Sequence, residues 1–172
     1  STQAFVRWGQ AVSQLIGQDL ALQHTPKPPR TDAFELVERV DYGEQVNAPT
    51  SILRFAPVAR PGLGGRWQRL LGGGRLPHFE VGDLAGVVPP GSAIPRFYSL
   101  ASGSRDGVLE ICVRKLPEGL CSQFLHGLKV GERMNAFIQL HPDFRPVSGE
   151  APVILIGAGT GIGPLAGFIR NN

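Results

Sequence analysis

The sequence predicts a mainly β protein, in which a six-stranded antiparallel barrel is followed by the first strand, loop and helix of an α/β domain. The first observation is composition, because 23 Gly and 15 Pro among 172 residues are typical of a chain with many turns. The second is a series of short β patterns separated by clusters of Gly, Pro, Ser and Asp. These patterns are Ala33–Val40, Thr50–Ala56, Asp83–Val88, Arg96–Ala101, Val108–Lys115 and Arg133–Leu140. Strands at this spacing indicate a closed or nearly closed antiparallel barrel.

An amphipathic helix and a proline-rich linker precede the barrel. Apolar residues recur at three- and four-residue steps and the pattern stops at Gly17; they are Phe5, Trp8, Val12, Leu15 and Ile16. Residues 24–30, HTPKPPR, favour extended geometry and cannot continue a helix. We therefore expect residues 1–30 to be the end of an upstream domain with its linker, and residues 31–147 to form the barrel.

Two segments interrupt the strand pattern inside the barrel. Arg60–Leu76 is too rich in glycine for a strand, and we expect a flexible excursion with one helical turn around Trp67. Ser122–Leu128 is predicted to be a short helix before the last strand, with Ser122 as its N-cap.

A change of pattern after Val147 predicts the start of a second domain over residues 148–172. The apolar strand Val153–Ile156 leads into the glycine loop Gly157–Gly163, and a helix is expected from Pro164, since proline suits the first helical position. The loop lacks both the third glycine of the dinucleotide fingerprint and the Lys-Ser/Thr of a P-loop. It is interpreted as a diphosphate loop of another type, with a purely structural turn as the alternative. One such unit cannot bury its own faces, so we expect a fragment of a longer protein.

Composition and charge argue against several other classes. The net charge is only +3 and the basic residues are scattered, which disfavours a nucleic-acid partner. No apolar run approaches the roughly 18 residues of a membrane helix, and no signal peptide is visible, so we expect a cytoplasmic protein unless segments outside this chain attach it to a membrane. Cys112 and Cys121 have no metal or redox spacing and are expected to be reduced thiols. The four histidines form no pair suited to a metal or a Ser-His-Asp arrangement, and no metal site is expected.

Three segments are suited to binding a dinucleotide. In Arg96–Ser99, strand alternation places Arg96 and Tyr98 on one face about 7 Å apart, so that a cation for a pyrophosphate lies beside an aromatic plane for a flavin. Ser99 adds a hydroxyl donor near the flavin nitrogen that receives hydride, and an ordinary edge strand is the alternative. Gly119–Ser122 offers backbone N–H groups and a hydroxyl to an anion, with a plain helix cap as the alternative. The third segment is the glycine loop.

In their order and spacing these segments resemble the ferredoxin–NADP reductase family, including the reductase modules of diflavin enzymes such as cytochrome P450 reductase and sulfite reductase flavoprotein. Phe79–Asp83 is similar to the family's aromatic-x-x-Gly-Asp strand, and Gly86–Pro90 to the turn after it. The remaining matches are Arg96–Ser99 to R-x-Y-[ST], Cys112–Arg114 to the next strand, Gly119–Ser122 to G-x-x-[ST] and Gly159–Pro164 to G-T-G-x-x-P. The resemblance runs from about residue 33 to the end of the chain.

The resemblance implies a reductase that binds FAD and NADPH and passes electrons to an FMN-containing flavodoxin-like domain or a small redox protein. It implies that Arg96 and Ser122 hold the FAD pyrophosphate. Tyr98 then stacks on the isoalloxazine with Ser99 beside N5, and these two form the catalytic pair. Arg114 takes the place of a lysine directed at NADPH. The complete implied cofactor-binding set is Arg96, Phe97, Tyr98, Ser99, Cys112, Val113, Arg114, Gly119, Leu120, Cys121, Ser122, Gly159, Thr160, Gly161 and Pro164.

Two departures from the family pattern leave alternatives open. Only Leu116–Glu118 separates the Arg114 strand from Gly119, and it holds no aromatic residue for adenine, so FMN is an alternative to FAD. The residues that select the 2′-phosphate in the family would lie beyond Asn172, so an NADH-dependent electron-transfer subunit is an alternative to an NADPH enzyme. Outside the enzymes, the alternative is a non-catalytic β-barrel that binds a nucleotide or a protein. We expect this chain alone to have little turnover.

Overall fold

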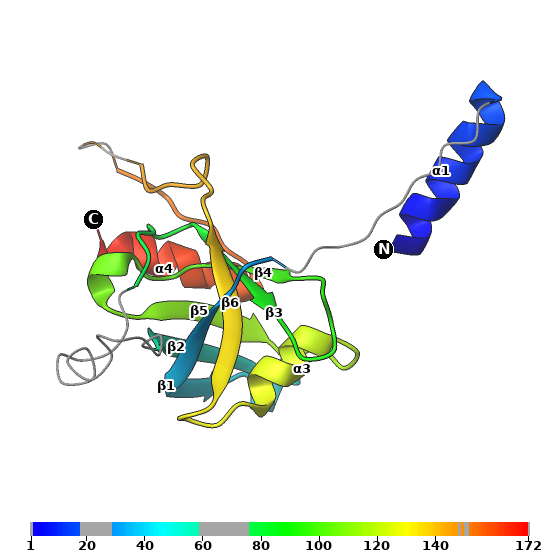
Figure 1. Cartoon of the computed structure of the whole chain (residues 1–172). Coiled ribbons are helices and arrows are strands. Elements are labelled where there is room, and N and C mark those ends of the chain that lie inside the picture. The colour runs from blue at the N-terminus through cyan, green and yellow to red at the C-terminus, as the bar shows by residue number, and fades with distance from the viewer. Residues whose placement is uncertain (1, 18–28, 59–75, 148, 150–151, 172) are drawn as a thin grey trace, which may run out of the picture.

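The computed structural model describes residues 2–17, 29–58, 76–147, 149 and 152–171 (Figure 1). Its strands are β1 (Asp32–Tyr42), β2 (Thr50–Pro57), β3 (Leu84–Val88), β4 (Arg96–Ser99), β5 (Leu109–Arg114) and β6 (Arg133–Gln139). Its α-helices are α1 (Thr2–Ile16), α3 (Leu120–Gly127) and α4 (Ile162–Arg170). Short 3₁₀ turns lie at Glu44–Val46, Ser104–Asp106 and Gly159–Gly161.

The strands form one antiparallel sheet that closes into a barrel. The hydrogen-bonded order is β4-β3-β6-β1-β2-β5. A bridge between Leu100 and Ile111 joins the two outer strands, and the Ala101 N–H donates to the Glu110 carbonyl at 2.9 Å. Each of the six strands expected for the barrel is present with its ends within two residues of the prediction, so the six-stranded antiparallel barrel is confirmed.

The core lies inside the barrel because apolar residues alternate along each strand. Leu36 of β1 lies opposite Phe55 of β2, and these two side chains are buried together with Phe34 and Leu53 of the same strands. The other strands add residues to the same cluster; among these are Val87, Leu109, Ile111, Val113, Met134 and Ala136. An irregularity between Leu36 and Glu38 shifts the β1–β2 register. Such a bulge increases local twist, which helps a sheet to close.

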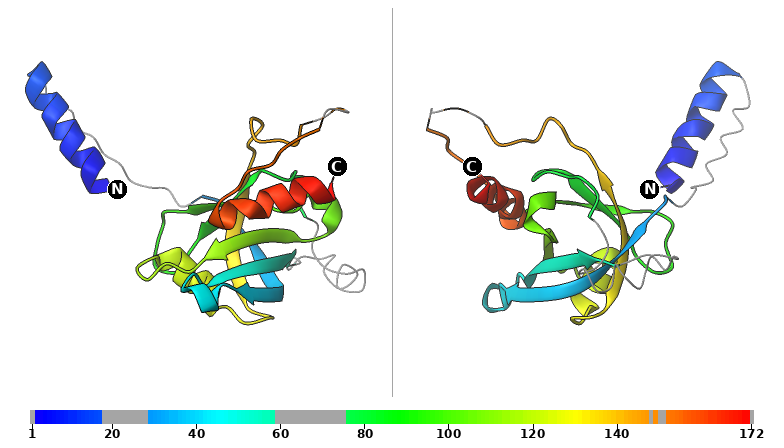
Figure 2. Two further views of the ribbon diagram at one scale, coloured as in Figure 1. Left: turned by 180° about the vertical axis from the view of Figure 1, so that it is seen from behind. Right: turned by 60° about the vertical axis from the view of Figure 1, so that its left-hand side comes forward.

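Two helices cover different parts of the barrel, as both views in Figure 2 show. Helix α3 buries Cys121 and Leu125 in the main core at one end of the barrel. Helix α4 packs Leu165 and Phe168 against Val81 in a second, smaller cluster. No helix of the described residues is long and apolar enough to cross a membrane.

Three local expectations differ from the structure. Val153–Ile156 is predicted to be a strand but joins no sheet; Ile154 and Ile156 are 86% and 90% exposed, because an extended segment becomes a strand only when another strand pairs with it. Helix α3 begins at Leu120 with Gly119 as its N-cap, so Ser122 is the third helical residue and not the cap. Pro164 is likewise the third residue of α4, where its missing N–H still removes no intrahelical hydrogen bond.

Two expectations fall mainly on residues that the structure does not describe. These are the glycine-rich excursion Arg60–Leu76, with its turn around Trp67, and most of the linker at residues 24–30. The domain boundaries near residues 30 and 147 stay predictions.

Candidate functional site

Strand β4 carries the first predicted binding segment at the edge of the barrel. Arg96 is exposed, and its Nη1 donates only long hydrogen bonds, at 3.4 and 3.2 Å, to the carbonyls of Ile94 and Pro95. Tyr98 is half-buried and packs against the main core. Ser99 ends the strand and is also half-buried. Arg96 and Tyr98 are thus two residues apart on one strand, as the sequence predicts, and their role as a binding pair stays a prediction.

Phe97 points away from Tyr98 and makes an aromatic contact of its own. Its ring meets Phe137 of β6 edge to face, with centroids 5.9 Å apart, across Gly86 of β3. A Cβ on Gly86 would lie 2.6 Å from Cε1 of Phe137, so only glycine leaves room for the ring. Phe97 is 47% exposed, and this contact positions β4 on β3 and β6.

The second predicted segment forms a tight loop into α3. The Ser122 Oγ accepts a hydrogen bond from the Leu116 N–H at 3.1 Å and donates to the Gly119 carbonyl at 3.0 Å. A Cβ on Gly119 would meet this Oγ and would lie 3.0 Å from Cβ of Leu116. The hydroxyl therefore shapes the loop, and the groups that the loop presents to an anion are the N–H groups in the first turn of α3. Leu120 is 55% exposed beside them.

The structure brings these two segments together. The side chain of Tyr98 of β4 lies close enough to that of Cys121, in the first turn of α3, for the two to interact. Burial is the main cause that raises the pKa of the Tyr98 hydroxyl, and the Cys121 contact raises it further. Burial also raises the pKa of the Cys121 thiol. Both groups stay protonated at neutral pH, so Arg96 is the charged member of this surface.

The predicted residues on β5 divide between the core and the surface. Val113 is 1% exposed and points into the core, so only its backbone is available to a ligand, and its carbonyl already lies 3.0 Å from His126 Nε2. Arg114 is exposed at the end of the strand. Cys112 is half-buried under the glycine loop, where a Cβ on Gly163 would lie 2.9 Å from its own Cβ.

The glycine loop turns directly into α4. Gly159, Thr160 and Gly161 form a 3₁₀ turn, and Pro164 is buried in the first turn of the helix. A Cβ on Gly157 would lie 2.7 Å from Cδ1 of Leu165, so the loop folds closely over the helix that follows it. The role of this loop as a diphosphate site stays a prediction.

Sequence reasoning missed Glu110, an acidic residue that the structure buries. Its carboxylate forms two ion pairs: Oε2 lies 2.6 Å from Arg54 Nε, and Oε1 lies 2.6 Å from Arg170 Nη2. Burial alone would raise the pKa of Glu110, but the two guanidinium groups outweigh it and the pKa lies below its ordinary value. The signal available in the sequence was an acidic residue between apolar neighbours in the strand LEICVR.

Asp83 was recognised as part of a strand motif but not as a buried ionic centre. Its side chain is fully buried and accepts the N–H groups of Glu80 at 2.9 Å and of His141 at 2.8 Å, and Arg145 Nη2 lies 2.5 Å from it. Burial alone would raise the pKa of Asp83, but these donors together hold it below its ordinary value. Asp83 thus ties the segment after β6 to the start of β3.

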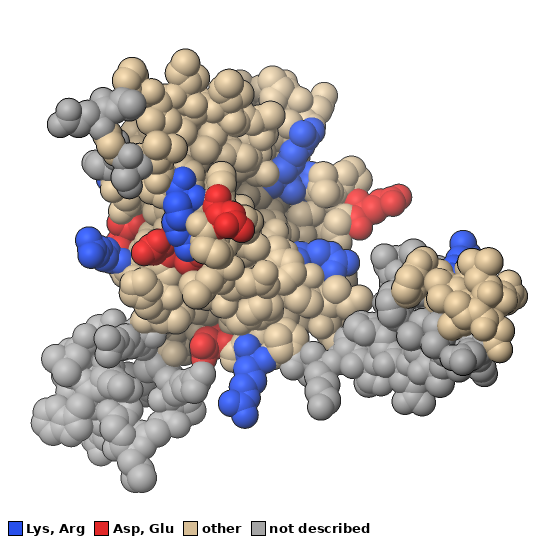
Figure 3. Space-filling model, turned by 90° about the horizontal axis from the view of Figure 1, so that it is seen from above, with Lys and Arg blue, Asp and Glu red and all other residues tan. Residues whose placement is uncertain are grey.

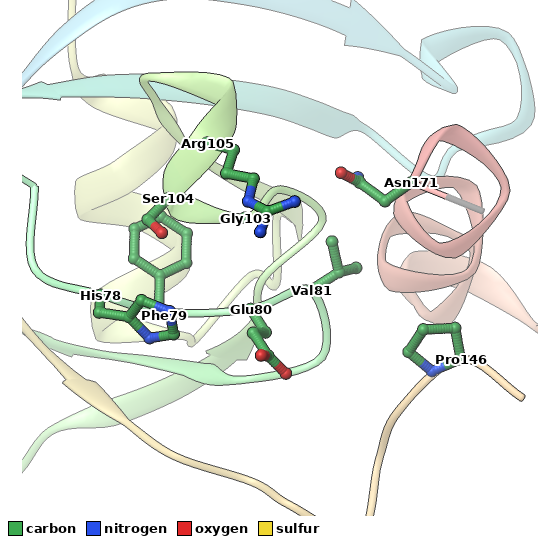
Figure 4. Close-up of a pocket in the computed structure, with 9 residues that line it drawn as sticks. All are labelled: His78, Phe79, Glu80, Val81, Gly103, Ser104, Arg105, Pro146 and Asn171. Atoms are coloured by element: carbon green, nitrogen blue, oxygen red, sulfur yellow. The ribbon is translucent and has the colours of Figure 1, made fainter. Parts of the chain in front are cut away.

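A separate pocket of about 260 Å³ lies in the seam between the barrel and the end of α4 (Figure 4). Its lining includes His78, Glu80, Arg105, Pro146 and Asn171 and none of the predicted binding residues. Across the described ranges, no group of three His, Cys, Asp or Glu side chains is placed to hold a metal ion. On the face seen from above in Figure 3, acidic and basic side chains are interspersed, without a patch of one sign.

Comparison with known proteins finds similarity to several reductases. No family model matches the chain. The reductase subunit of an aromatic O-demethylase from Amycolatopsis sp. is 39% identical over 126 residues, which cover 70% of this chain and 36% of that protein. NADPH-dependent diflavin oxidoreductase 1 of Cryptococcus neoformans is 33% identical over 107 residues, 56% of this chain and 17% of that protein.

The chain is related to the ferredoxin–NADP reductase family. The crystal structure of Amycolatopsis cytochrome P450 reductase GcoB matches with a TM-score of 0.57 at 28% identity, over 90% of this chain and 42% of that one. Ferredoxin-NADP⁺ reductase of Plasmodium falciparum matches with a TM-score of 0.61 at 18% identity, over 82% of this chain and 51% of that one, which supports the fold alone. The chain spans well under two thirds of the length of these relatives.

Proposed function

We propose that residues 31–147 bind FAD and that the protein carrying this chain is an NAD(P)H-dependent flavoprotein reductase. The observation that carries the proposal is the meeting of β4 with the first turn of α3 at the Tyr98–Cys121 contact. It gathers a guanidinium, an aromatic ring and helix N-terminal amides on one surface. The names of the relatives support the same activity, since they include a reductase subunit and an NADPH-dependent diflavin oxidoreductase.

The residues present fit a flavin dinucleotide. Arg96 is exposed, and among the described residues it donates to the carbonyls of Ile94 and Pro95, so it is available to a pyrophosphate. Gly119 keeps the loop tight, because a Cβ there would meet the Ser122 Oγ, and the loop leads into the first-turn amides of α3, which suit an anion. Tyr98 is held at one edge by Cys121, which leaves its ring to stack on a flat partner.

In this proposal each side chain has a limited task. FAD, when bound, accepts hydride and releases electrons one at a time. Arg96 neutralises the pyrophosphate, Tyr98 orients the flavin ring, and Ser99 places a hydroxyl beside the reacting edge. Ser122 acts through the loop, because its hydroxyl is bonded to Leu116 and Gly119.

The domain arrangement and the electron acceptor belong to the proposal as well. We infer that residues 148–172 begin a nicotinamide-binding domain, with Gly159, Thr160, Gly161 and Pro164 facing the dinucleotide. NADPH is favoured over NADH by the diflavin relatives, whose name specifies NADPH. The acceptor is an FMN-containing domain or a small redox protein, in line with relatives named as the methane monooxygenase component C and the toluate 1,2-dioxygenase electron transfer component.

Flavin retention tests the proposal directly. The purified chain is mixed with FAD, desalted and examined for flavin absorbance, and phosphodiesterase treatment of the released flavin separates FAD from FMN. Arg96→Ala should weaken FAD binding by roughly tenfold or more and leave riboflavin binding nearly unchanged, because only FAD carries the pyrophosphate. Arg133→Ala, at an exposed arginine on β6, is the matched control.

Two outcomes would count against the assignment. A chain that retains no flavin would favour the non-catalytic barrel. Equal losses of FAD and riboflavin in Arg96→Ala would remove Arg96 from the pyrophosphate site.

A further inference from the structure

We propose that Glu110 and Arg170 are positioning residues that hold helix α4, and with it the glycine loop Gly157–Gly163, against the flavin barrel. The role of this loop in binding a nucleotide rests on the proposed function. The packing of the helix does not, because it follows from contacts within the chain.

The ionic contact is built on a fixed acceptor. Arg170 Nη2 lies 2.6 Å from Glu110 Oε1 and 2.7 Å from the Ala101 carbonyl, and its Nη1 lies 3.3 Å from Glu110 Oε2. Arg54 of the neighbouring strand holds the second Glu110 oxygen at 2.6 Å and is itself paired with Glu38 at 2.7 Å. Contacts within the barrel therefore fix the position of the Glu110 carboxylate independently of helix α4.

The Glu110–Arg170 ion pair differs from an ordinary surface ion pair in the burial of its acidic member. The Glu110 side chain is 7% exposed, so its charge needs a partner, and both of its oxygens have one. Arg170 lies in the last turn of α4, where a cation also interacts favourably with the helix dipole. Its two donors to Glu110 and one to Ala101 restrict both the distance and the rotation of the helix end.

Two glycines bring the rest of α4 close to the barrel. Gly163 and Gly167 are one turn apart on the same face of the helix. A Cβ on Gly167 would meet the Ala101 carbonyl oxygen and would lie 2.6 Å from Cγ1 of Val81. A Cβ on Gly163 would lie 2.9 Å from Cβ of Cys112. Glycine inside a helix lowers helix stability by about 1 kcal/mol relative to alanine. The two glycines on this face are therefore explained by the close approach of the helix to the barrel and not by helix propensity.

The contacts lie at both ends of the helix. The glycine loop enters α4 at Gly163, above Cys112, and Arg170 closes the contact at the other end. The apolar cluster of Val81, Leu165 and Phe168 lies between them. A helix held at both ends cannot pivot on the barrel, so the loop keeps one position relative to β4 and β5.

Cys112 is a native reporter of this packing. It is half-buried beneath Gly163, whereas Cys121 is 3% exposed in the main core and reports on global opening. Reaction of each thiol with 5,5′-dithiobis(2-nitrobenzoic acid) is followed in the full 172-residue chain, and Cys112→Ser assigns the signal. Burial, and then the Glu110 charge, raise the pKa of the Cys112 thiol. Removing Arg170 leaves Glu110 with Arg54 as its remaining partner, so its charge acts more strongly on the thiol and slows the reaction. Any acceleration therefore reports exposure.

Arg170→Gln should accelerate modification of Cys112 by roughly tenfold or more while Cys121 stays protected, because only the helix opens. Arg170→Lys should restore part of the protection, since a lysine can reach Glu110 or Ala101 but cannot keep the forked geometry. Gly167→Ala leaves all charges in place and should produce the same acceleration, because its Cβ meets the Ala101 backbone. Arg133→Gln removes an exposed pair with Glu35 and serves as the control that changes neither rate.

Three results separate the inference from its rivals. Unchanged Cys112 rates in both Arg170→Gln and Gly167→Ala would overturn it. Equal acceleration of Cys112 and Cys121, with loss of flavin retention, would also overturn it, since Arg170 would then stabilise the whole fold and not the position of α4. Selective exposure of Cys112 in a chain that retains no flavin would support the positioning role and reject the proposed function.

Discussion

Replacement of Asp83 by alanine should destabilise the fold more than any single exposed carboxylate, because this side chain is a fully buried ionic centre. It accepts two backbone N–H groups and pairs with Arg145, whose Nε also contacts Glu80 at 2.9 Å. Alanine removes the acceptor of two part-buried amides and one partner of the Arg145 guanidinium. The segment after β6 loses its attachment to the start of β3 at the same time.

The magnitude follows from the number of donors. Removing one partner of a buried pair typically costs about 3–5 kcal/mol, and the two amide bonds to the charged oxygen fall within that figure. We expect Asp83→Ala to lower the free energy of unfolding by about 3–5 kcal/mol in urea, followed by circular dichroism at neutral pH. Asp106→Ala is the matched control, because Asp106 accepts the Gly103 N–H at 2.7 Å in an exposed turn and should cost no more than about 1 kcal/mol.

The same residue predicts a pH dependence with a definite sign. Because the folded pKa of Asp83 lies below its ordinary 3.8, the ionised side chain stabilises the fold above that value, and this stability is lost as the pH falls through the folded pKa. The difference in unfolding free energy between wild type and Asp83→Asn should therefore be largest at neutral pH and shrink below pH 3.8. A cost of Asp83→Ala below about 1 kcal/mol, or a difference that grows on acidification, would refute the reasoning.

Two further predictions concern packing and helix ends. Gly86→Ala should cost about 1–3 kcal/mol in urea denaturation because its Cβ would press on the Phe137 ring, and the cost should fall in a Phe137→Ala background; an equal cost in both backgrounds would contradict this. Arg39→Met should speed hydrogen exchange of the α3 amides several-fold, because Arg39 Nη1 donates to the carbonyls of His126 at 2.6 Å and Leu128 at 3.1 Å at the end of that helix. Exchange of α3 that does not change would show that packing alone holds the helix.

The barrel could be predicted because its strands have a local signature. Alternation along segments such as Thr50–Ala56, bounded by turn residues, matches β2 to within one residue. The motif Arg96–Ser99 could be placed on a strand for the same reason, and the resemblance to the reductase family implied that it shares a site with Gly119–Ser122. In the structure Tyr98 lies close to Cys121, and the shared site stays a prediction.

Ion pairs between distant parts of the chain could not be predicted. Glu110 and Arg170 are separated by 60 residues and Asp83 and Arg145 by 62. Nothing in the pattern around an acidic residue says which distant guanidinium will neutralise it. The predicted role of Ser122 as an N-cap was wrong for a related reason, since the chain reverses at Gly119 and the hydroxyl bonds back into that loop.

By itself the sequence determined the six strands, their antiparallel character and the residues with chemistry suited to a flavin, because periodicity and side-chain type are local properties. Only the tertiary structure decided which strands are neighbours, which hydroxyls are already bonded and how α4 is attached. The apolar run Val153–Ile156 shows most clearly what a sequence pattern cannot predict. Its composition is that of a buried strand, yet it forms none here, because strand structure needs a hydrogen-bonding partner and not only a pattern.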